Sequence, residues 1–164
     1  MNLETLAIGF LRFEKRCPLV LCERTHCMTV GRPDVYGLTK SRHTFEIEIK
    51  RSMADLRANG LKRHVEYRDI WIKKWPRKFW FLVPNDIHKK AELEIPQWAG
   101  LLTEHEGRIV TIKHAPVNSL SERLPIKQAL KWVHLQSNQL YAVHRDFSYL
   151  QEHVRNLSNP IKLA

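Results

Sequence analysis

The sequence predicts a single α/β domain with a mixed β-sheet and a C-terminal helical extension. Residues 45–50 alternate strictly between apolar and charged side chains, which is the pattern of a half-buried strand. Residues 78–84 form an apolar run without alternation, typical of a strand covered on both faces at the centre of an α/β sheet. From Ser121 onward, apolar residues recur at helical spacing. These three patterns favour an α/β body followed by a helical tail.

A helix is predicted at the start of the chain. Leu3, Leu6, Phe10 and Phe13 recur at helical spacing, and Pro18 follows the expected end of this helix. The amphipathic pattern predicts that one face of the helix packs on the sheet.

Three strands are predicted after this helix. Short apolar runs indicate strands at 19–22 and 35–38, with a break at Gly31 between them. The alternating strand at 43–50 comes third. If strands two and three form a hairpin, residues near the start of one lie across from residues near the end of the other.

The next elements are a short helix and further strands. The spacing of Ser52 and Asp55 matches a capping box, so a helix is predicted over 53–59 with Gly60 as its stop. Helical spacing resumes over 61–67.

The C-terminal third supplies one more strand and the tail. Residues 108–113 are a strand candidate, and the segment 116–118 is the predicted boundary. The chain is therefore divided into a domain at 1–116 and a helical extension at 117–164, which is expected to pack on the same domain.

The chain carries a large excess of positive charge. It has 164 residues, of which 27 are Lys or Arg and 17 are Asp or Glu, for a formal net charge of +10. Nucleic acid is the expected partner, because neutralising phosphates releases counterions and gives sequence-independent affinity. No apolar run approaches the ~20 residues of a membrane helix. Nor does a basic segment precede an apolar stretch at the N-terminus. We therefore expect no membrane association and a cytoplasmic location, in a bacterial cell or in the host of a bacteriophage.

The cysteines do not form a disulfide framework. Cys17, Cys22 and Cys27 are odd in number and lie at four-residue gaps, which fits a reducing compartment. Together with His26 they suggest a zinc site as an alternative, although zinc sites usually contain Cys-x-x-Cys pairs. The simpler interpretation is free thiols in or near the core.

Two carboxylates and a lysine are expected to meet at the end of the alternating strand. Glu48 and Lys50 project from the polar face, opposite to the apolar residues. Asp34 lies across from Glu48 if the hairpin loop has three or five residues or contains a bulge, whereas a four-residue loop pairs it with Ile47. The chemistry therefore predicts an odd loop or a bulge.

Facing carboxylates favour a cation between them. Without one, each carboxylate raises the pKa of the other, and Lys50 neutralises a single charge. Mg²⁺ or Mn²⁺ suits carboxylate oxygens, waters and a substrate phosphate. Beside such a metal, Lys50 could orient a water or stabilise charge on the phosphate. The alternative interpretation is a solvated strand face with a cross-strand ion pair.

The placement of these residues resembles a known nuclease pattern. Pro33-Asp34 followed by Glu48-Ile49-Lys50, with a helix before and a helix and strand after, resembles the PD-(D/E)XK nuclease superfamily. The chain is more closely similar to the MmcB-like bacterial DNA-repair domains over 48–56, over the strand at 78–84 and over Trp98–Leu101. The resemblance covers about residues 3–116 and leaves the tail out.

The resemblance implies a fold and a set of site residues. The fold would be a restriction-endonuclease-like core, a mixed central sheet flanked by helices in the order αβββαβ. Asp34 and Glu48 would bind the metal, the backbone carbonyl of Ile49 would be a further ligand, and Lys50 would be catalytic. Many members add a glutamate, for which the candidates are Glu4, Glu14 and Glu23. Glu23 is nearest to the acid of the closer relatives, and a surface acid is the alternative.

A basic segment with interleaved tryptophans follows the candidate site. Cations there would contact phosphates, and an exposed tryptophan could stack on an unpaired base. Trp80 is expected in the core, and the sequence leaves Trp75 open between core and surface. The candidate nucleic-acid contacts are Lys40, Arg42, Lys62, Arg63, Lys73, Lys74 and Arg77.

These expectations converge on a metal-dependent nuclease that hydrolyses DNA phosphodiester bonds in DNA repair, recombination or phage DNA processing. The rival from another class is a non-catalytic DNA-binding module that keeps the nuclease fold. The zinc-dependent DNA-binding protein is a third alternative. The tail is expected to contribute to DNA contact or to a homodimer.

Overall fold

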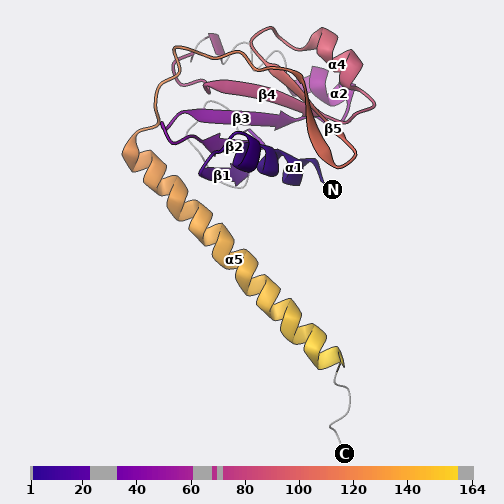
Figure 1. The fold of residues 1–164 in the computed structure, drawn as a ribbon, viewed down its shortest axis with the longest axis vertical. Coiled ribbons are helices and arrows are strands. Elements are labelled where there is room, and N and C mark those ends of the chain that lie inside the picture. Colours follow the sequence, from indigo (N-terminus) through magenta and orange to yellow (C-terminus); the bar gives the residue numbers. More distant parts are fainter. Residues whose placement is uncertain (1, 23–32, 61–67, 70–71, 159–164) are drawn as a thin grey trace, which may run out of the picture.

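The fold is built around one six-stranded mixed sheet, seen in the computed structural model (Figure 1). The structure describes residues 2–22, 33–60, 68–69 and 72–158. The strands lie in the sheet in the same order as in the chain. They are β1 (Leu19–Cys22), β2 (Val35–Leu38), β3 (Thr44–Ile49), β4 (Lys78–Val83), β5 (Gly100–His105) and β6 (Arg108–Lys113).

The strand directions explain where the helices lie. β1, β2 and β3 form an antiparallel meander, β3, β4 and β5 run parallel, and β6 returns antiparallel. Parallel neighbours need crossover connections. α2 (Met53–Asp55), continued by η2 (Leu56–Gly60), lies between β3 and β4, and α4 (His88–Glu94) lies between β4 and β5. The predicted mixed sheet with flanking helices is confirmed, and β5 and α4 are additions to the prediction.

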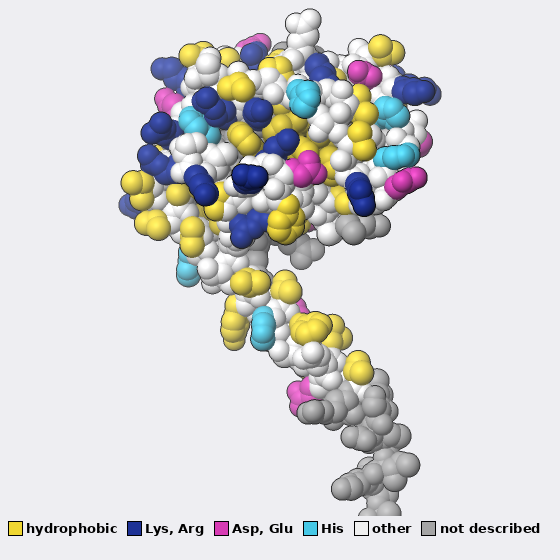
Figure 2. Space-filling model, viewed as in Figure 1, with side chains coloured by type: hydrophobic (Ala, Val, Ile, Leu, Met, Phe, Trp, Pro, Cys, Tyr) yellow, Lys and Arg dark blue, Asp and Glu magenta, His cyan; other side chains and the backbone are white. Residues whose placement is uncertain are grey.

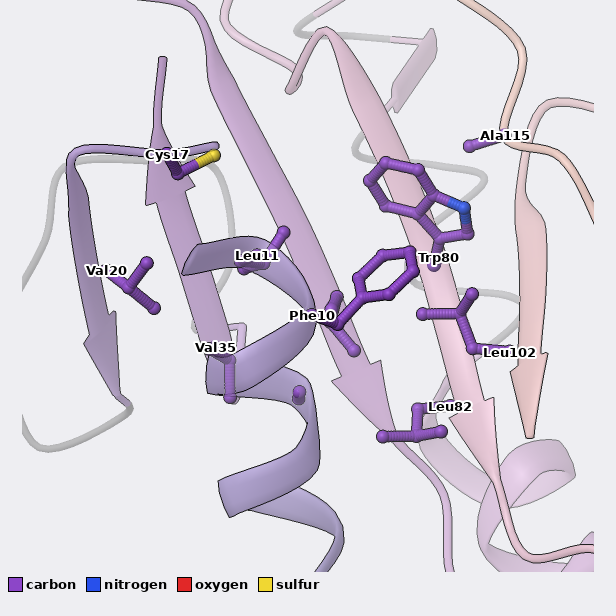
Figure 3. Packing of buried hydrophobic residues seen from close by; sticks show 11 residues of the cluster. Phe10, Leu11, Cys17, Val20, Val35, Trp80, Leu82, Leu102 and Ala115 are labelled. Atoms are coloured by element: carbon purple, nitrogen blue, oxygen red, sulfur yellow. The ribbon is translucent and has the colours of Figure 1, made fainter. Parts of the chain in front are cut away.

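The first face of the sheet is covered by the N-terminal helix. α1 (Leu3–Gly9) begins at Asn2, whose side chain accepts a hydrogen bond from the Glu4 amide, and continues as η1 (Phe10–Glu14). Phe10 meets Trp80 edge to face, with ring centroids 5.8 Å apart. Figure 3 shows this continuous apolar cluster between the helix and the strands. The prediction of a core position for Trp80 is confirmed.

The second face of the sheet has two separate apolar clusters. One covers β4 and β5 and includes Leu56, Trp75 and Phe81, and the other covers β1 and β2 and includes Tyr36 and Trp132. β3 runs between these two pairs of strands. Ile47 of β3 packs toward the first face, so the residues that alternate with it point to the second face. These are Thr44, Glu46, Glu48 and Lys50. A polar row therefore divides the second face.

The description of β3 as half-buried was wrong. Glu46 and Lys50 are 1% and 6% exposed, so the polar side of the strand is covered as well. The interpretation of this row as a solvated strand face is thus contradicted. Trp75, which the sequence left open, is 2% exposed and packs against Phe79 and Trp98.

The C-terminal extension is a single long helix, α5 (Ile126–Ser158), which leaves the body and extends away from it (Figure 1). Its first turns pack on β1 and β2 through Ala129 and Trp132. The segment before it is held along the body, since the amides of Asn118 and Glu122 donate to the carbonyls of Arg77 and Lys73. The predicted boundary at 116–118 thus lies inside the body, and packing on the domain is confined to the root of α5.

No helix in the described part of the chain combines the length and apolar character needed to cross a membrane. The segments predicted as helical at 61–67 lie outside the described residues.

Candidate functional site

The register of the β2–β3 hairpin brings the two predicted carboxylates together. Val35 pairs with Ile47 and Tyr36 with Glu46, so the next position places Asp34 across from Glu48. The loop between the strands spans residues 39–43, which is five residues. Arg42 adopts a left-handed conformation in this loop, with φ of 65°. The predicted odd loop is confirmed, and so is the register that it was expected to impose.

Asp34 is held against the end of β3. Its Oδ2 accepts a hydrogen bond from the Ile49 amide at 2.5 Å. Val35 belongs to the cluster under α1, so its neighbour Asp34 points to the second face, as Glu48 does. The backbone of β3 thereby fixes the first carboxylate beside the second.

Lys50 lies between two further carboxylates. Its Nζ is 3.0 Å from Oε1 of Glu48 and 3.8 Å from Oδ1 of Asp55. Its amide donates to the carbonyl of Leu82 at 2.9 Å, which ties the end of β3 to β4. The three predicted catalytic residues therefore share one end of β3.

The N-terminal cap of α2, next to the site, positions Asp55 near Lys50. Its amide donates to Oγ of Ser52 at 3.1 Å, and its Oδ2 accepts from the Arg51 amide at 3.0 Å. This confirms the predicted cap. It also explains why Asp55 reaches Lys50, because the cap fixes the carboxylate over the last residues of β3.

The site is enclosed and carries more negative than positive charge. The side chains of Lys50 and Glu48 are 7% and 12% exposed, so water screens their charges poorly. Glu48 and Asp55 place two carboxylates at the Lys50 ammonium group, and Asp34 lies across from Glu48 at the same end of β3. Buried charges require partners, and a divalent cation would balance this set.

The donor atoms fit a hard cation. Asp34 and Glu48 offer carboxylate oxygens, and Mg²⁺ commonly takes one or two carboxylates with waters and a substrate phosphate. Among the residues that the structure describes, no group of three His, Cys, Asp or Glu side chains is arranged to hold a metal ion. The carbonyl of Ile49 and substrate oxygens would have to complete the coordination.

The two described candidates for an additional glutamate, Glu4 and Glu14, do not join this cluster. Glu4 and Glu14 lie on the helix that covers the first face, whereas Asp34 and Glu48 point to the second face. Glu23 lies outside the described residues.

Cys17 behaves as a packing residue of the core. Cys17 is buried, and burial raises the pKa of its thiol to about 11, although Arg12 lowers it. Its Sγ would lie 2.8 Å from a Cβ added at Gly37, so the thiol fills the space that this glycine leaves. A thiol that stays protonated is a poor zinc ligand. Cys27 and His26 lie outside the described residues.

The predicted nucleic-acid contacts separate into different environments. Lys40 is exposed in the hairpin loop. Arg42 donates a hydrogen bond to the carbonyl of Leu124 at 3.1 Å, so it holds the segment before α5 against the β2–β3 loop. Lys73 and Lys74 are exposed in the turns before β4, and Arg77 is partly buried next to it. Lys62 and Arg63 lie outside the described residues.

A basic pocket of about 490 Å³ opens on the second face beside the start of β3. Thr44 contributes to its wall, together with side chains from the turns before β4 and from the root of α5. Its cations are Lys73, Lys74, Arg123, Lys127 and Lys131. Figure 2 shows many Lys and Arg side chains on the body, whereas apolar side chains follow one another down the tail. Arg123, Lys127 and Lys131 were missed because the sequence does not show which residues of the helical extension lie beside the turns before β4.

Comparison with known proteins supports the fold. No family model matches the chain, and no curated protein matches it. A solved structure of a protein of unknown function from Silicibacter pomeroyi is similar, with a TM-score of 0.53 and 22% identity, over 97% of this chain and 92% of that chain. At this identity the likeness concerns the fold alone. Because it covers nearly the whole chain, it includes the tail as well as the body.

Proposed function

We propose that the protein is a metal-dependent nuclease that hydrolyses phosphodiester bonds in DNA. The observation that carries this proposal is the hairpin register, which sets Asp34 across from Glu48 while Lys50 lies 3.0 Å from Glu48. The excess of cations, with a formal net charge of +10, suits a polyanionic substrate.

The fold assigned with this function is a restriction-endonuclease-like core. The order α1, β1, β2, β3, α2, β4 is the order αβββαβ that the resemblance to PD-(D/E)XK nucleases implies. β5, β6 and α5 would be additions around it. An antiparallel meander next to a parallel fourth strand supports this assignment.

Each site residue has a distinct role in the proposal. Asp34, oriented by the Ile49 amide, and Glu48 would hold Mg²⁺ or Mn²⁺ together with the carbonyl of Ile49. Such an ion supplies Lewis-acid polarisation of the phosphate and a nucleophilic water at neutral pH. Lys50 would donate hydrogen bonds to phosphate oxygens as negative charge builds on them. Asp55 would hold the Lys50 ammonium group in position.

The test is cleavage of plasmid and branched DNA with Mg²⁺ or Mn²⁺. Asp34→Asn, Glu48→Gln and Lys50→Met should each reduce the cleavage rate by roughly 10²–10³-fold or more, because each removes a group that acts on the reacting phosphate. Glu92→Gln and Lys90→Met are matched controls, since they neutralise exposed residues on α4. Cleavage that survives all three site substitutions would contradict the assignment, provided that circular dichroism shows folded variants.

A second candidate is a non-catalytic DNA-binding module with the same fold. The ion pairs of Lys50 with Glu48 and Asp55 favour it, because they partly compensate the cluster without any metal. This alternative predicts DNA binding with no cleavage under any metal. It also predicts that Asp34→Asn does not abolish DNA binding.

A further inference from the structure

The basic pocket joins two segments that are far apart in the sequence. Lys73 and Lys74 precede β4, and Arg123, Lys127 and Lys131 belong to the segment entering α5 and to its root. The Glu122 amide donates to the carbonyl of Lys73 at 2.7 Å, and the Leu124 amide donates to the carbonyl of Arg42 at 2.7 Å. Backbone hydrogen bonds therefore set the two walls of the pocket.

The cations of the α5 wall gather at an electrostatic cost. Lys127 and Lys131 are four residues apart on one helix, and like charges at this spacing destabilise a helix by a few tenths of a kcal/mol. In the described part of the chain, Arg123, Lys127 and Lys131 form no ion pair. Glu122 is the one carboxylate among the residues that line the pocket. Such a cluster is suited to an anionic ligand with several charges.

The pocket and the carboxylates lie on the same face of β3. Thr44 at the pocket and Glu48 at the site are four residues apart on one strand, a separation of about 13 Å at ~3.3 Å per residue. We propose that the pocket binds the phosphate backbone of the same nucleic acid whose bond lies at the carboxylates, a few nucleotides from that bond.

This inference rests on the proposed function for the position of the bond, but not for binding itself. His43, the neighbour of Thr44 in the chain, offers a probe of binding at the pocket. Burial lowers its pKa, and the positive charges of Arg77 and Arg123 lower it further. A phosphate bound nearby would offset these charges and raise the pKa of His43, which NMR can follow.

The binding test uses fluorescence anisotropy of a labelled 20-nucleotide duplex with the Asp34→Asn protein in EDTA, so that no cleavage occurs. Adding Lys127→Glu and Lys131→Glu should weaken binding at least 10-fold at low salt. The slope of the logarithm of affinity against the logarithm of salt concentration should fall by the amount that corresponds to about two phosphate contacts. The matched control adds Lys89→Glu and Lys90→Glu, the same charge change on exposed α4. The rise in the pKa of His43 on binding should occur in the control and not in the pocket variant.

Equal weakening by both pairs, or no weakening by the pocket pair, would overturn the proposal. Inorganic tripolyphosphate serves as a second probe. Competition by it at concentrations equal to those of DNA phosphate would show a site for small polyanions and contradict the assignment to nucleic acid. If the duplex binds as expected while the wild-type protein cleaves nothing, the nuclease assignment fails and the pocket stands.

A second inference comes from the outer face of α5. Apolar residues recur every seven positions along the helix, with others three residues later, which is the a and d spacing of a coiled coil. We name this row the α5 seam: Ile126, Val133, Leu140, Val143, Phe147, Leu150 and Val154. From Val133 on, each seam residue leaves 50–70% of its surface exposed.

The helix lacks support for most of its length. It spans 33 residues, or about 50 Å, and within the described part of the chain only its root contacts the body. Most helical stability in proteins comes from packing of an apolar face. Burying the exposed seam in two copies would remove on the order of 1,200 Å² of surface, which is the size of a stable interface.

The net charge of the helix around the α5 seam indicates which kind of partner the seam can bind. Residues 140–158 contain two basic and two acidic residues, so this part of the helix does not attract nucleic acid or an anionic lipid surface. Its neutrality also avoids repulsion between identical helices. The geometry points to a second copy of this chain, paired through the α5 seam as a two-stranded coiled coil.

The test is the mass in solution, measured by light scattering after gel filtration. The wild-type chain should give twice its 19.4 kDa, and Phe147→Glu with Leu150→Glu should give 19.4 kDa. Tyr141→Glu with Tyr149→Glu is the matched control, because these exposed aromatic residues lie off the seam and the dimer should persist. Near-UV circular dichroism should show an unchanged body in both.

Three results would overturn this second proposal. The wild-type chain could remain at 19.4 kDa up to roughly 100 μM, far above a micromolar dissociation constant. The two pairs of substitutions could dissociate it equally. A mass of three or more copies would also contradict a two-stranded seam.

Discussion

The two faces of the sheet are built differently, although they share the same six strands. Beneath α1, Phe10, Leu11, Trp80 and Leu82 belong to one continuous apolar cluster. On the other face, the polar residues of β3 separate an apolar cluster under α2 and α4 from one under the root of α5. The first face thus has one continuous core, whereas the second face has two separate cores, and the polar row between them holds the candidate site and borders the basic pocket.

The largest expected effect tests the first face. Phe10→Ala should lower the free energy of unfolding by about 3–5 kcal/mol, because it removes a buried ring against Trp80 and leaves a cavity. Phe13→Ala, three residues on and 79% exposed, should change it by less than about 0.5 kcal/mol. Urea unfolding followed by circular dichroism measures both. Equal effects would show that the ring of Phe10 does not anchor a packed core against Trp80.

A comparable but smaller effect is expected from the α5 side of the second face. Trp132 is fully buried, with its ring centroid 4.9 Å from that of Tyr36. Trp132→Ala should cost about 3 kcal/mol of unfolding free energy. Leu130→Ala, on the exposed side of the same helix, is the control and should be near neutral. If Trp132→Ala were neutral too, the root of α5 would not belong to the body.

The smallest expected effect concerns the pH dependence of the free energy of unfolding, to which His43 contributes. The folded pKa of His43 lies below its ordinary value of 6.5, so the unfolded chain binds a proton first as the pH falls. The contribution of neutral His43 to stability is therefore complete above pH 6.5 and is lost as the pH falls toward the folded pKa. Urea midpoints at pH 7.5 and 5.5 should decline less for His43→Asn than for the wild type. An identical decline would place His43 outside the field of Arg77 and Arg123.

Much of the fold could be predicted because its signals are local. The strand over 45–49 alternates, and the apolar run at 78–83 lacks alternation, so both strands follow from side-chain pattern alone. β5 was missed because Gly100–His105 contains only two large apolar residues. α4 was missed because Ala91 is its one buried residue, which gives no apolar stripe.

The candidate site could be predicted in part for the same reason. Asp34, Glu48 and Lys50 are brought together by a hairpin, whose register depends on loop length and alternation. The burial of Glu46 and Lys50 could not be predicted, because it depends on segments that pack across β3 from elsewhere in the chain. The pocket was missed likewise, since Lys73 and Lys127 meet only through tertiary contacts.

The residues of the carboxylate–lysine cluster all come from one uninterrupted stretch, 34–55. A single recombination event that exchanged this stretch would carry the whole cluster into a related scaffold. The cations of the pocket are encoded in two other stretches, before β4 and at the start of α5. Inheritance could thus preserve the carboxylate–lysine cluster while the residues of the pocket diverge, so that the two proposed parts of the site would change independently.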